Sequence, residues 1–214
     1  MVGHQVLVLS IGVRVPIPEQ CFMKKVLLFP GAFNPPHLGH VKMIEIALEK
    51  ERFDEIWIIP SGKRIDKAIS TSYEDRRNLG NLFVTYLQNK FPIPTLLNTV
   101  ELDDLDGKPT EDILKEIKSN NEVEMTQLIG LDGYLNLRDG LEDTKEKFLI
   151  INRQGFEPPS DLSETENVKI LDGETLDISS TKVRLLVKDE NMEYTKLVPE
   201  NIATYISEHK DLYR

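Results

Sequence analysis

Short runs of consecutive apolar residues alternate with amphipathic segments from Lys25 almost to the end of the chain. Apolarity that is continuous within a run is typical of parallel strands covered on both faces. The repetition of strand and helix patterns therefore predicts an α/β fold, a doubly wound parallel sheet with helices on both faces. The predicted strands are Val26–Phe29, Ile56–Ile59, Thr95–Leu102, Met125–Ile129, Phe148–Ile151 and Val168–Leu171.

The segments between these runs carry apolar residues at helical spacing. One predicted helix is entered through Thr71 or Ser72, each followed three residues later by an acid, which is a helix-start pattern. Pro199 suits the first turn of a last helix. The apolar stripes are Val41, Ile44 and Leu48; Leu79, Leu82, Phe83, Tyr86 and Leu87; the stretch Thr110–Ile117; and Ile202, Tyr205 and Ile206.

Charge and cysteine content exclude several classes of function. The chain has 26 basic and 36 acidic residues, a net charge of −10, which repels nucleic acids and anionic membranes over most of the surface. No apolar run approaches the roughly 18 residues that cross a bilayer. The single Cys21 excludes an internal disulfide and a cysteine-based zinc site, and it fits a cytoplasmic protein. A phosphate ligand would need a small local pocket.

The first 22 residues stand apart from the pattern. We predict one domain over residues 23–214, preceded by an N-terminal extension over residues 1–22. The apolar run Val6–Val13 has neither a preceding basic residue nor a following cleavage site, so a secretory signal is not expected. Two interpretations stay open: an extension before a natural start at Met23, or an extra edge strand interrupted at Pro16 and Pro18.

The segment Pro30–His40 leaves the first predicted strand and opens the first helix. Its small residues Gly31 and Ala32 let the backbone approach a ligand, and a helix start offers N–H groups and a positive dipole end to an anion. His37 and His40 lie three residues apart, on one side of the first turn, and can reach one phosphate chain together. A zinc-binding pair and two histidines that cap the helix are the alternatives, and no third metal ligand stands nearby at metal spacing.

Two motifs carry a resemblance to a known family. GAFNPPHLGH, residues 31–40, resembles the G-x-F-x-P-x-H-x-G-H signature of the nucleotidylyltransferase superfamily. ISSTKVR, residues 178–184, resembles the I-S-S-T-x-x-R segment of the nicotinate or nicotinamide mononucleotide adenylyltransferases. The second motif is another helix start, whose hydroxyls and arginine suit the terminal phosphates of ATP. The expected sheet is then of the Rossmann-like type.

Weaker matches extend the resemblance over roughly residues 24–213. Gly130-Leu131-Asp132 is similar to the family's G-x-D, which contacts the adenosine part of ATP; Asp132 can alternatively cap a short helix. The stretch that begins at Asn152 and the tail from Val198 to Tyr213 also resemble family segments. The ATP-binding residues implied are Gly31, Ala32, Phe33, Gly39, Gly130, Asp132, Ser179, Ser180 and Thr181.

The resemblance implies attack by a mononucleotide phosphate on the α-phosphorus of ATP, which releases pyrophosphate and forms the dinucleotide for NAD biosynthesis. The attacking phosphate is already anionic at neutral pH, so catalysis needs positioned donors rather than a general base. The resemblance assigns the α-phosphate to His40 and the phosphate chain to His37, and it assigns the leaving pyrophosphate to Arg184 with Ser180 and Thr181. It implies Mg²⁺ carried by the triphosphate, with no metal held by a protein cage.

The acceptor side departs from the family pattern. Residues 108–110 read Lys-Pro-Thr where bacterial members have Ser-Tyr-Thr, and no tryptophan follows Asp132. We assign the acceptor side to Thr110 and Tyr134, although Tyr134 can alternatively be a packing residue. The resemblance implies a cationic loop after the second strand that reaches the phosphates, and we assign this role to Lys67, from the basic stretch between residues 63 and 77; a solvated charged loop is the alternative. Nicotinate mononucleotide is the expected acceptor; nicotinamide mononucleotide, phosphopantetheine and an inactive ATP-binding sensor are the alternatives, although His37 argues against phosphopantetheine. The sequence does not determine the oligomeric state.

Overall fold

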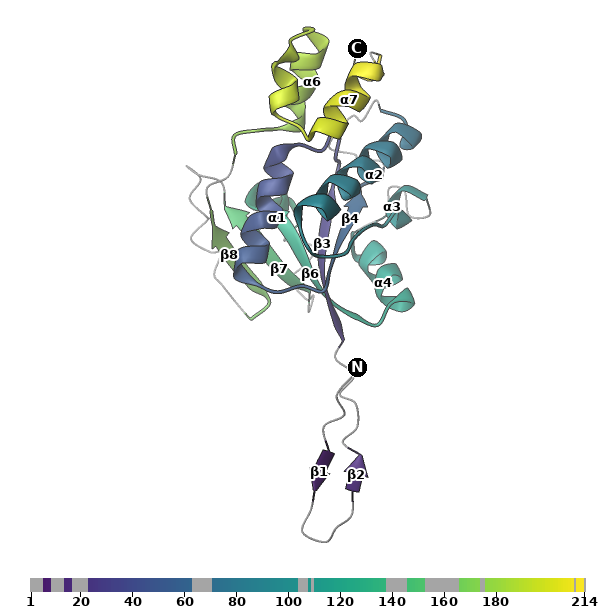
Figure 1. The fold of residues 1–214 in the computed structure, drawn as a ribbon, viewed down its shortest axis with the longest axis vertical. Helices are drawn as coiled ribbons and strands as arrows, with labels where there is room; N and C mark the ends of the chain where they lie inside the picture. The colour runs from purple at the N-terminus through teal and green to yellow at the C-terminus, as the bar shows by residue number, and fades with distance from the viewer. Residues whose placement is uncertain are drawn as a thin grey trace.

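Six strands form one sheet in the order β5-β4-β3-β6-β7-β8, and every neighbouring pair is parallel. Figure 1 labels β4, β3, β6, β7 and β8 of this sheet. The computed structural model describes residues 6–8, 14–16, 23–62, 71–103, 108, 110–137, 146–152, 166–173, 176–209 and 211–213. The strands are β3 (Lys24–Gly31), β4 (Glu55–Pro60), β5 (Thr95–Leu97), β6 (Val123–Gly130), β7 (Lys147–Asn152) and β8 (Val168–Asp172). The predicted doubly wound parallel sheet is confirmed.

Helices cover both faces of this sheet, because alternate strand residues point to opposite sides. Leu27 and Ile58 belong to one apolar cluster, which packs under the first two and the last helices of the chain. Leu28 and Ile59 face the other way, against the fourth helix. The helices are α1 (Leu38–Lys50), α2 (Tyr73–Lys90), α3 (Val100–Asp103), α4 (Thr110–Asn120), α5 (Leu131–Leu137), α6 (Ser180–Lys188) and α7 (Glu200–Glu208).

The third predicted strand is wrong over its second half. Residues 95–102 were expected to be extended, but β5 ends at Leu97 and α3 begins at Val100. The reason is local: the side chain of Asn98 accepts a hydrogen bond from the Val100 N–H at 3.0 Å, which turns the chain. The apolar residue Leu102 is buried from a helix rather than from a strand.

Local capping sets the helix starts. Ser72 caps α2, because its hydroxyl accepts from the Asp75 N–H at 3.1 Å, and this settles the choice between Thr71 and Ser72. Pro199 is the N-cap of α7 rather than a residue of its first turn, since its ψ of 146° is extended. Ile202 and Ile206 form the buried face of that helix.

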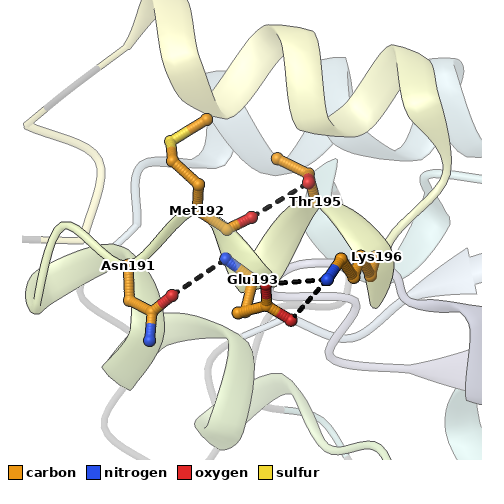
Figure 2. A network of polar contacts seen from close by, with 5 residues as sticks. All are labelled: Asn191, Met192, Glu193, Thr195 and Lys196. Atoms are coloured by element: carbon orange, nitrogen blue, oxygen red, sulfur yellow. Dashed lines mark hydrogen bonds and ion pairs between the residues drawn. The ribbon is translucent and has the colours of Figure 1, made fainter.

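A short 3-10 turn, η2 (Met192–Lys196), joins α6 to α7. Figure 2 shows its polar contacts: the Asn191 side chain accepts from the Glu193 N–H at 3.0 Å, and Lys196 binds both carboxylate oxygens of Glu193. This turn leads to Leu197, whose carbonyl accepts a hydrogen bond of 2.8 Å from the Leu38 N–H at the start of α1. The C-terminal segment is therefore tied to the first helix.

Two short strands precede the sheet. β1 (Val6–Val8) and β2 (Arg14–Pro16) pair with each other, antiparallel, in a separate two-stranded sheet. These described residues therefore do not form an extra edge strand on the main sheet. The division of the chain between residues 22 and 23 stays a prediction. Within the described residues, every helix is too short or too polar to span a bilayer.

Candidate active site

The ends of β3 and β6 mark the switch point of the sheet. The chain continues from β3 toward β4 on one side and later from β6 toward β7 on the other. Residue pairing between the two strands stops at Leu28 and Gln127, although each strand runs three residues further, to Gly31 and Gly130. Ligands of open α/β sheets bind beyond the carboxyl ends of strands at such a point. Both motifs that follow β3 and β6 begin here.

His40 is held in one orientation. Its Nδ1 accepts a hydrogen bond of 3.1 Å from the backbone N–H of His37, so the neutral ring carries its proton on Nε2. The rings of Phe29, Phe33 and Phe83 lie at steep angles to the imidazole, with centroids 5.8, 5.1 and 6.3 Å away. This aromatic surround fixes the ring and makes Nε2 the hydrogen-bond donor of a neutral His40.

His37 lies directly against His40. The two imidazoles stack with centroids 3.7 Å apart, and His37, which is 6% exposed, is also the N-cap of α1. A β-carbon added at Gly39 would stand 2.9 Å from the His37 ring, so only glycine leaves room for this stack. The two imidazoles therefore lie side by side, as predicted. His37 also caps α1, so the alternative interpretation of a helix cap holds for this residue at the same time.

The motif glycines make room for side chains of the chain itself. A β-carbon at Gly31 would lie 3.0 Å from the Phe33 ring, and one at Gly130 would lie 2.9 Å from a carboxylate oxygen of Asp132. Phe33 has a φ of +44°, rare for a bulky residue, and its buried ring lies edge-to-face against His40. Close packing of the loop on its own side chains is what these glycines provide.

The start of α1 is less open than the sequence suggests. The N–H of Leu38 is bound to the carbonyl of Leu197 at 2.8 Å, and the N–H of His40 is bound to the carbonyl of His37 at 2.9 Å. The expectation of free N–H groups for an anion is wrong at these two positions, because a C-terminal segment and the capping turn already satisfy them. The side-chain donors therefore carry more of any anion contact.

The second motif meets the first, although 145 to 150 residues separate them in sequence. Ser180 donates from its hydroxyl to the Pro35 carbonyl at 2.9 Å, and Arg184 donates from Nη1 to the Asn34 carbonyl at 2.8 Å. Arg184 Nη2 also donates to the Thr181 hydroxyl at 3.1 Å. The paired imidazoles and the α6 hydroxyls and guanidinium thus lie on one small region at the carboxyl edge of the sheet.

Two arginines at the start of α2 have partners inside the protein. Arg76 is 1% exposed, and its guanidinium donates to the carbonyls of Ser61 and Gly62 beyond the end of β4. Arg77 pairs with Asp103 at the surface. Cations in the first turn of a helix oppose its dipole. Here the carbonyls of Ser61 and Gly62 and the carboxylate of Asp103 offset this unfavourable interaction with the dipole. The Arg76 charge therefore lies buried beside the carboxyl end of the sheet.

Residues 28–186, which contain both motifs, match the family model described as cytidylyltransferase-like. The chain belongs to this family. Among curated proteins, the probable nicotinate-nucleotide adenylyltransferase of Clostridium acetobutylicum is 28% identical over 207 residues, covering 88% of this chain and 98% of the relative. The protein of the same name from Bacillus pumilus is 28% identical over 193 residues, covering 87% and 97%.

Solved structures agree on the fold of this cytidylyltransferase-like chain. Nicotinic acid mononucleotide adenylyltransferase of Plasmodium falciparum, complexed with NaAD, superposes with a TM-score of 0.70 at 21% identity, covering 88% of this chain and 98% of that one. The crystal structure of a putative nicotinate-nucleotide adenylyltransferase from Vibrio parahaemolyticus gives a TM-score of 0.60 at 21% identity, covering 90% of this chain and 96% of that one. At this identity the likeness establishes the Rossmann-like fold.

The remaining predicted site residues differ in burial and in their place in the fold. Tyr134 is 9% exposed and packs edge-to-face on Phe148, with centroids 5.4 Å apart, in an apolar cluster. This placement leaves little of its ring to stack on a ligand, because the cluster already covers it. Thr110 is the first residue of α4. Asp132 lies inside the first turn of α5, exposed, so it is not the N-cap. Lys67 lies outside the described residues.

Two residues at the site escaped the sequence analysis. Asn34 and Thr71 are both buried, and the Thr71 hydroxyl donates to the Asn34 side-chain oxygen at 2.6 Å. Asn34 occupies a variable position of the first motif, and Thr71 stands beside the N-cap of α2, so neither had a signal of its own. They are recognised only in the structure, where two polar side chains that lie 37 residues apart in the sequence are buried and bonded to each other.

Proposed function

We propose that this chain transfers AMP from ATP to nicotinate mononucleotide, releasing pyrophosphate and forming the dinucleotide for NAD biosynthesis. The observation that carries the proposal is the contact of Arg184 and Ser180 of α6 with the loop that bears His37 and His40. It brings donors for two ends of a triphosphate together at the switch point of the sheet. The names of the relatives and their coverage of the whole length support the choice of reaction.

The proposed mechanism needs no nucleophile from the protein. The acceptor is a phosphate monoester, which is anionic at neutral pH and attacks the α-phosphorus itself. His40 donates from Nε2 to an α-phosphate oxygen, where negative charge accumulates in the transition state. His37 holds the phosphate chain beside it. Arg184, with Ser180 and Thr181, binds the β- and γ-phosphates as they leave.

Magnesium fits this scheme as part of the Mg–ATP substrate. The donors that meet at the helix starts are N–H and O–H groups, which contact phosphate oxygens rather than a cation. We therefore assign the ion to the triphosphate and water, with charge neutralisation as its contribution.

The ATP and acceptor sides rest on different support. We assign the adenosine to Gly130 and Asp132, at the end of β6, and the phosphates to the loop over residues 31–39 and to Ser179. Thr110 stays a predicted acceptor contact and Lys67 a predicted contact of the phosphates, whereas Tyr134 serves packing. Cytoplasmic location, the absence of a nucleic-acid partner and any homo-oligomer also stay predictions.

Pyrophosphate release tests the proposal. The protein is incubated with ATP and Mg²⁺ and with nicotinate mononucleotide, nicotinamide mononucleotide or phosphopantetheine in separate reactions. We expect release with nicotinate mononucleotide at a kcat/KM at least tenfold above that for the other two. Preference for another acceptor would keep adenylyl transfer and reject the nicotinate assignment. ATP binding without release for any acceptor would identify a sensor.

A further inference from the structure

Asn34 joins three separate parts of the chain. Its side-chain oxygen accepts from the Thr71 hydroxyl at 2.6 Å, and its carbonyl accepts from Arg184 Nη1 at 2.8 Å. The residue itself lies in the loop between β3 and α1, three residues before His37. One buried residue thus contacts the residue that precedes the α2 cap and the guanidinium of α6, inside the loop that carries the imidazoles.

The bond to Thr71 orients the loop. Asn34 and Thr71 are 4% and 7% exposed, so water does not replace a lost partner and a bond between them is costly to break. The side chain and the carbonyl belong to one residue. A fixed side chain therefore fixes the direction of the carbonyl that Arg184 meets.

Arg184 keeps its full charge in this arrangement. Its partners are a carbonyl and the Thr181 hydroxyl, which are neutral, and among the described residues it makes no ion pair with a carboxylate. A guanidinium held by neutral oxygens leaves its charge for a ligand.

We propose that Asn34 is a positioning residue, held by Thr71, that aims Arg184 at the phosphates that leave as pyrophosphate. This inference rests on the proposed function, because it assigns Arg184 the leaving group. Asn34 acts through its neighbours: Thr71 fixes the amide, the carbonyl holds one N–H of the guanidinium, and the remaining N–H groups bind phosphate oxygens. Displacement of a positioned group by about 1 Å can lower a rate on the order of 100-fold.

The test uses Thr71→Val, which removes the hydroxyl and keeps the shape, and Thr71→Ser as its matched control, which keeps the hydroxyl. We measure pyrophosphate release with ATP, Mg²⁺ and nicotinate mononucleotide, and the melting temperature of each variant. We expect Thr71→Val to lower kcat/KM for ATP about tenfold, and Thr71→Ser to stay within about twofold of the parent protein. The KM for the acceptor should change less than about threefold, because the loss lies on the ATP side.

Thr71→Val is also measured in a protein that already carries Arg184→Ala. This double variant separates an effect on the position of Arg184 from a general effect on the fold. There, Thr71→Val should have less than about a twofold further effect, since the group it positions is gone. A tenfold effect that persists without Arg184, or an unchanged kcat/KM for ATP in Thr71→Val, overturns the proposal.

Asn34→Ala gives an independent outcome if Thr71→Val does not fold. It removes the side-chain acceptor of the Thr71 hydroxyl and keeps the backbone carbonyl, so kcat/KM for ATP should fall about tenfold. An unchanged kcat/KM for ATP in Asn34→Ala also rejects the inference. If the unmodified protein releases no pyrophosphate with any acceptor, the proposed function fails instead. The two failures are therefore distinct.

Discussion

Charged side chains lie at both ends of the sheet, but the groups that they contact differ between the two ends. At the amino ends of the strands a cavity of about 380 Å³ is lined by acidic and basic side chains that pair with one another. Lys147 binds Glu124 at 2.6 Å, and Lys169 binds Glu51. At the carboxyl ends, the described donors of Arg184 and Ser180 meet backbone carbonyls instead.

This difference teaches which end is built for an anion. A lysine paired with a carboxylate is electrically neutralised, and surface pairs of this kind contribute little to stability. A guanidinium bound only to neutral oxygens keeps its charge, and its unused N–H groups can bind phosphate. The cavity at the amino ends is thus a charge-balanced surface, whereas the carboxyl edge is the end to which we assign the phosphates, although its parts lie in three loops.

His40→Ala should produce the largest contrast between the two ends. Loss of one preorganised donor costs on the order of 10²–10³-fold in kcat, while the melting temperature should change little since α1 keeps its buried face. The measurement is the steady-state rate with ATP and nicotinate mononucleotide, with Lys147→Met at the other end as the control. Normal turnover in His40→Ala would remove the role assigned to it.

Gly39→Ala should have a smaller effect at the same edge. The added methyl group would stand 2.9 Å from the His37 ring and push it off His40. Alanine favours a helix over glycine by about 1 kcal/mol, so thermal stability should be kept while kcat/KM falls about tenfold. Kinetics and a melting curve on one preparation check this. Loss of stability in parallel with activity would point to misfolding instead.

Tyr213→Phe tests a buried group beside the carboxyl edge. Burial raises the pKa of the Tyr213 phenol above its usual 10.0, although the nearby Arg184 charge and Thr71 hydroxyl oppose part of the shift. The phenol oxygen makes no hydrogen bond of ordinary geometry among the described residues. A raised native pKa gives stability that is present below pH 10 and is lost as pH rises above it. We expect the variant to match the parent within about 1 kcal/mol at pH 8 and to lose less stability at pH 10.5.

Urea unfolding at both pH values makes the comparison. Tyr205→Phe is the control, because the Tyr205 hydroxyl donates to Asp75 at 2.8 Å and its loss should lower stability by about 1 kcal/mol at pH 8. Equal losses for both variants at pH 8, or an unchanged alkaline loss in Tyr213→Phe, would contradict the placement of the phenol.

Lys147→Met should have the smallest effect. The hydrogen bond from Lys147 holds the pKa of Glu124 below its usual 4.5, so the pair gives stability above that pH and loses it as pH falls through the lowered value. Both side chains are partly exposed, which limits the contribution to less than about 1 kcal/mol. Unfolding at pH 7 and pH 3 measures it, and kcat should not change. A lowered kcat would connect the amino edge to catalysis.

Most of the sheet was predictable because apolar runs are a local signal. Continuous apolarity at Val26–Phe29 and Ile56–Ile59 identified buried parallel strands, and Thr71 and Ser72, each followed three residues later by an acid, identified a helix start. The prediction failed at Asn98, where a side-chain hydrogen bond bends an apolar stretch into α3. Periodicity alone does not separate a short buried helix from the end of a strand.

The candidate site divides in the same way. Its motif residues were visible in sequence, because the spacing of His37 and His40 and the hydroxyls before Arg184 are local patterns. The role of each glycine was not visible in the sequence, because Gly31 and Gly39 make room for aromatic and imidazole rings that only the folded structure places next to them. Arg76 and Asn34 were also not predictable as buried groups, because their partners come from other loops.

By itself, the sequence determined the layered α/β architecture, the two helix starts that carry donors, and the paired imidazoles, since each follows from residues a few positions apart. Only the tertiary structure decided that Arg184 meets the loop of His37 and His40, that Leu197 occupies an N–H of α1, and that Asn34 joins Thr71 to α6. Such contacts depend on how the closing segments pack over the edge of the sheet, and no short stretch of chain contains that information.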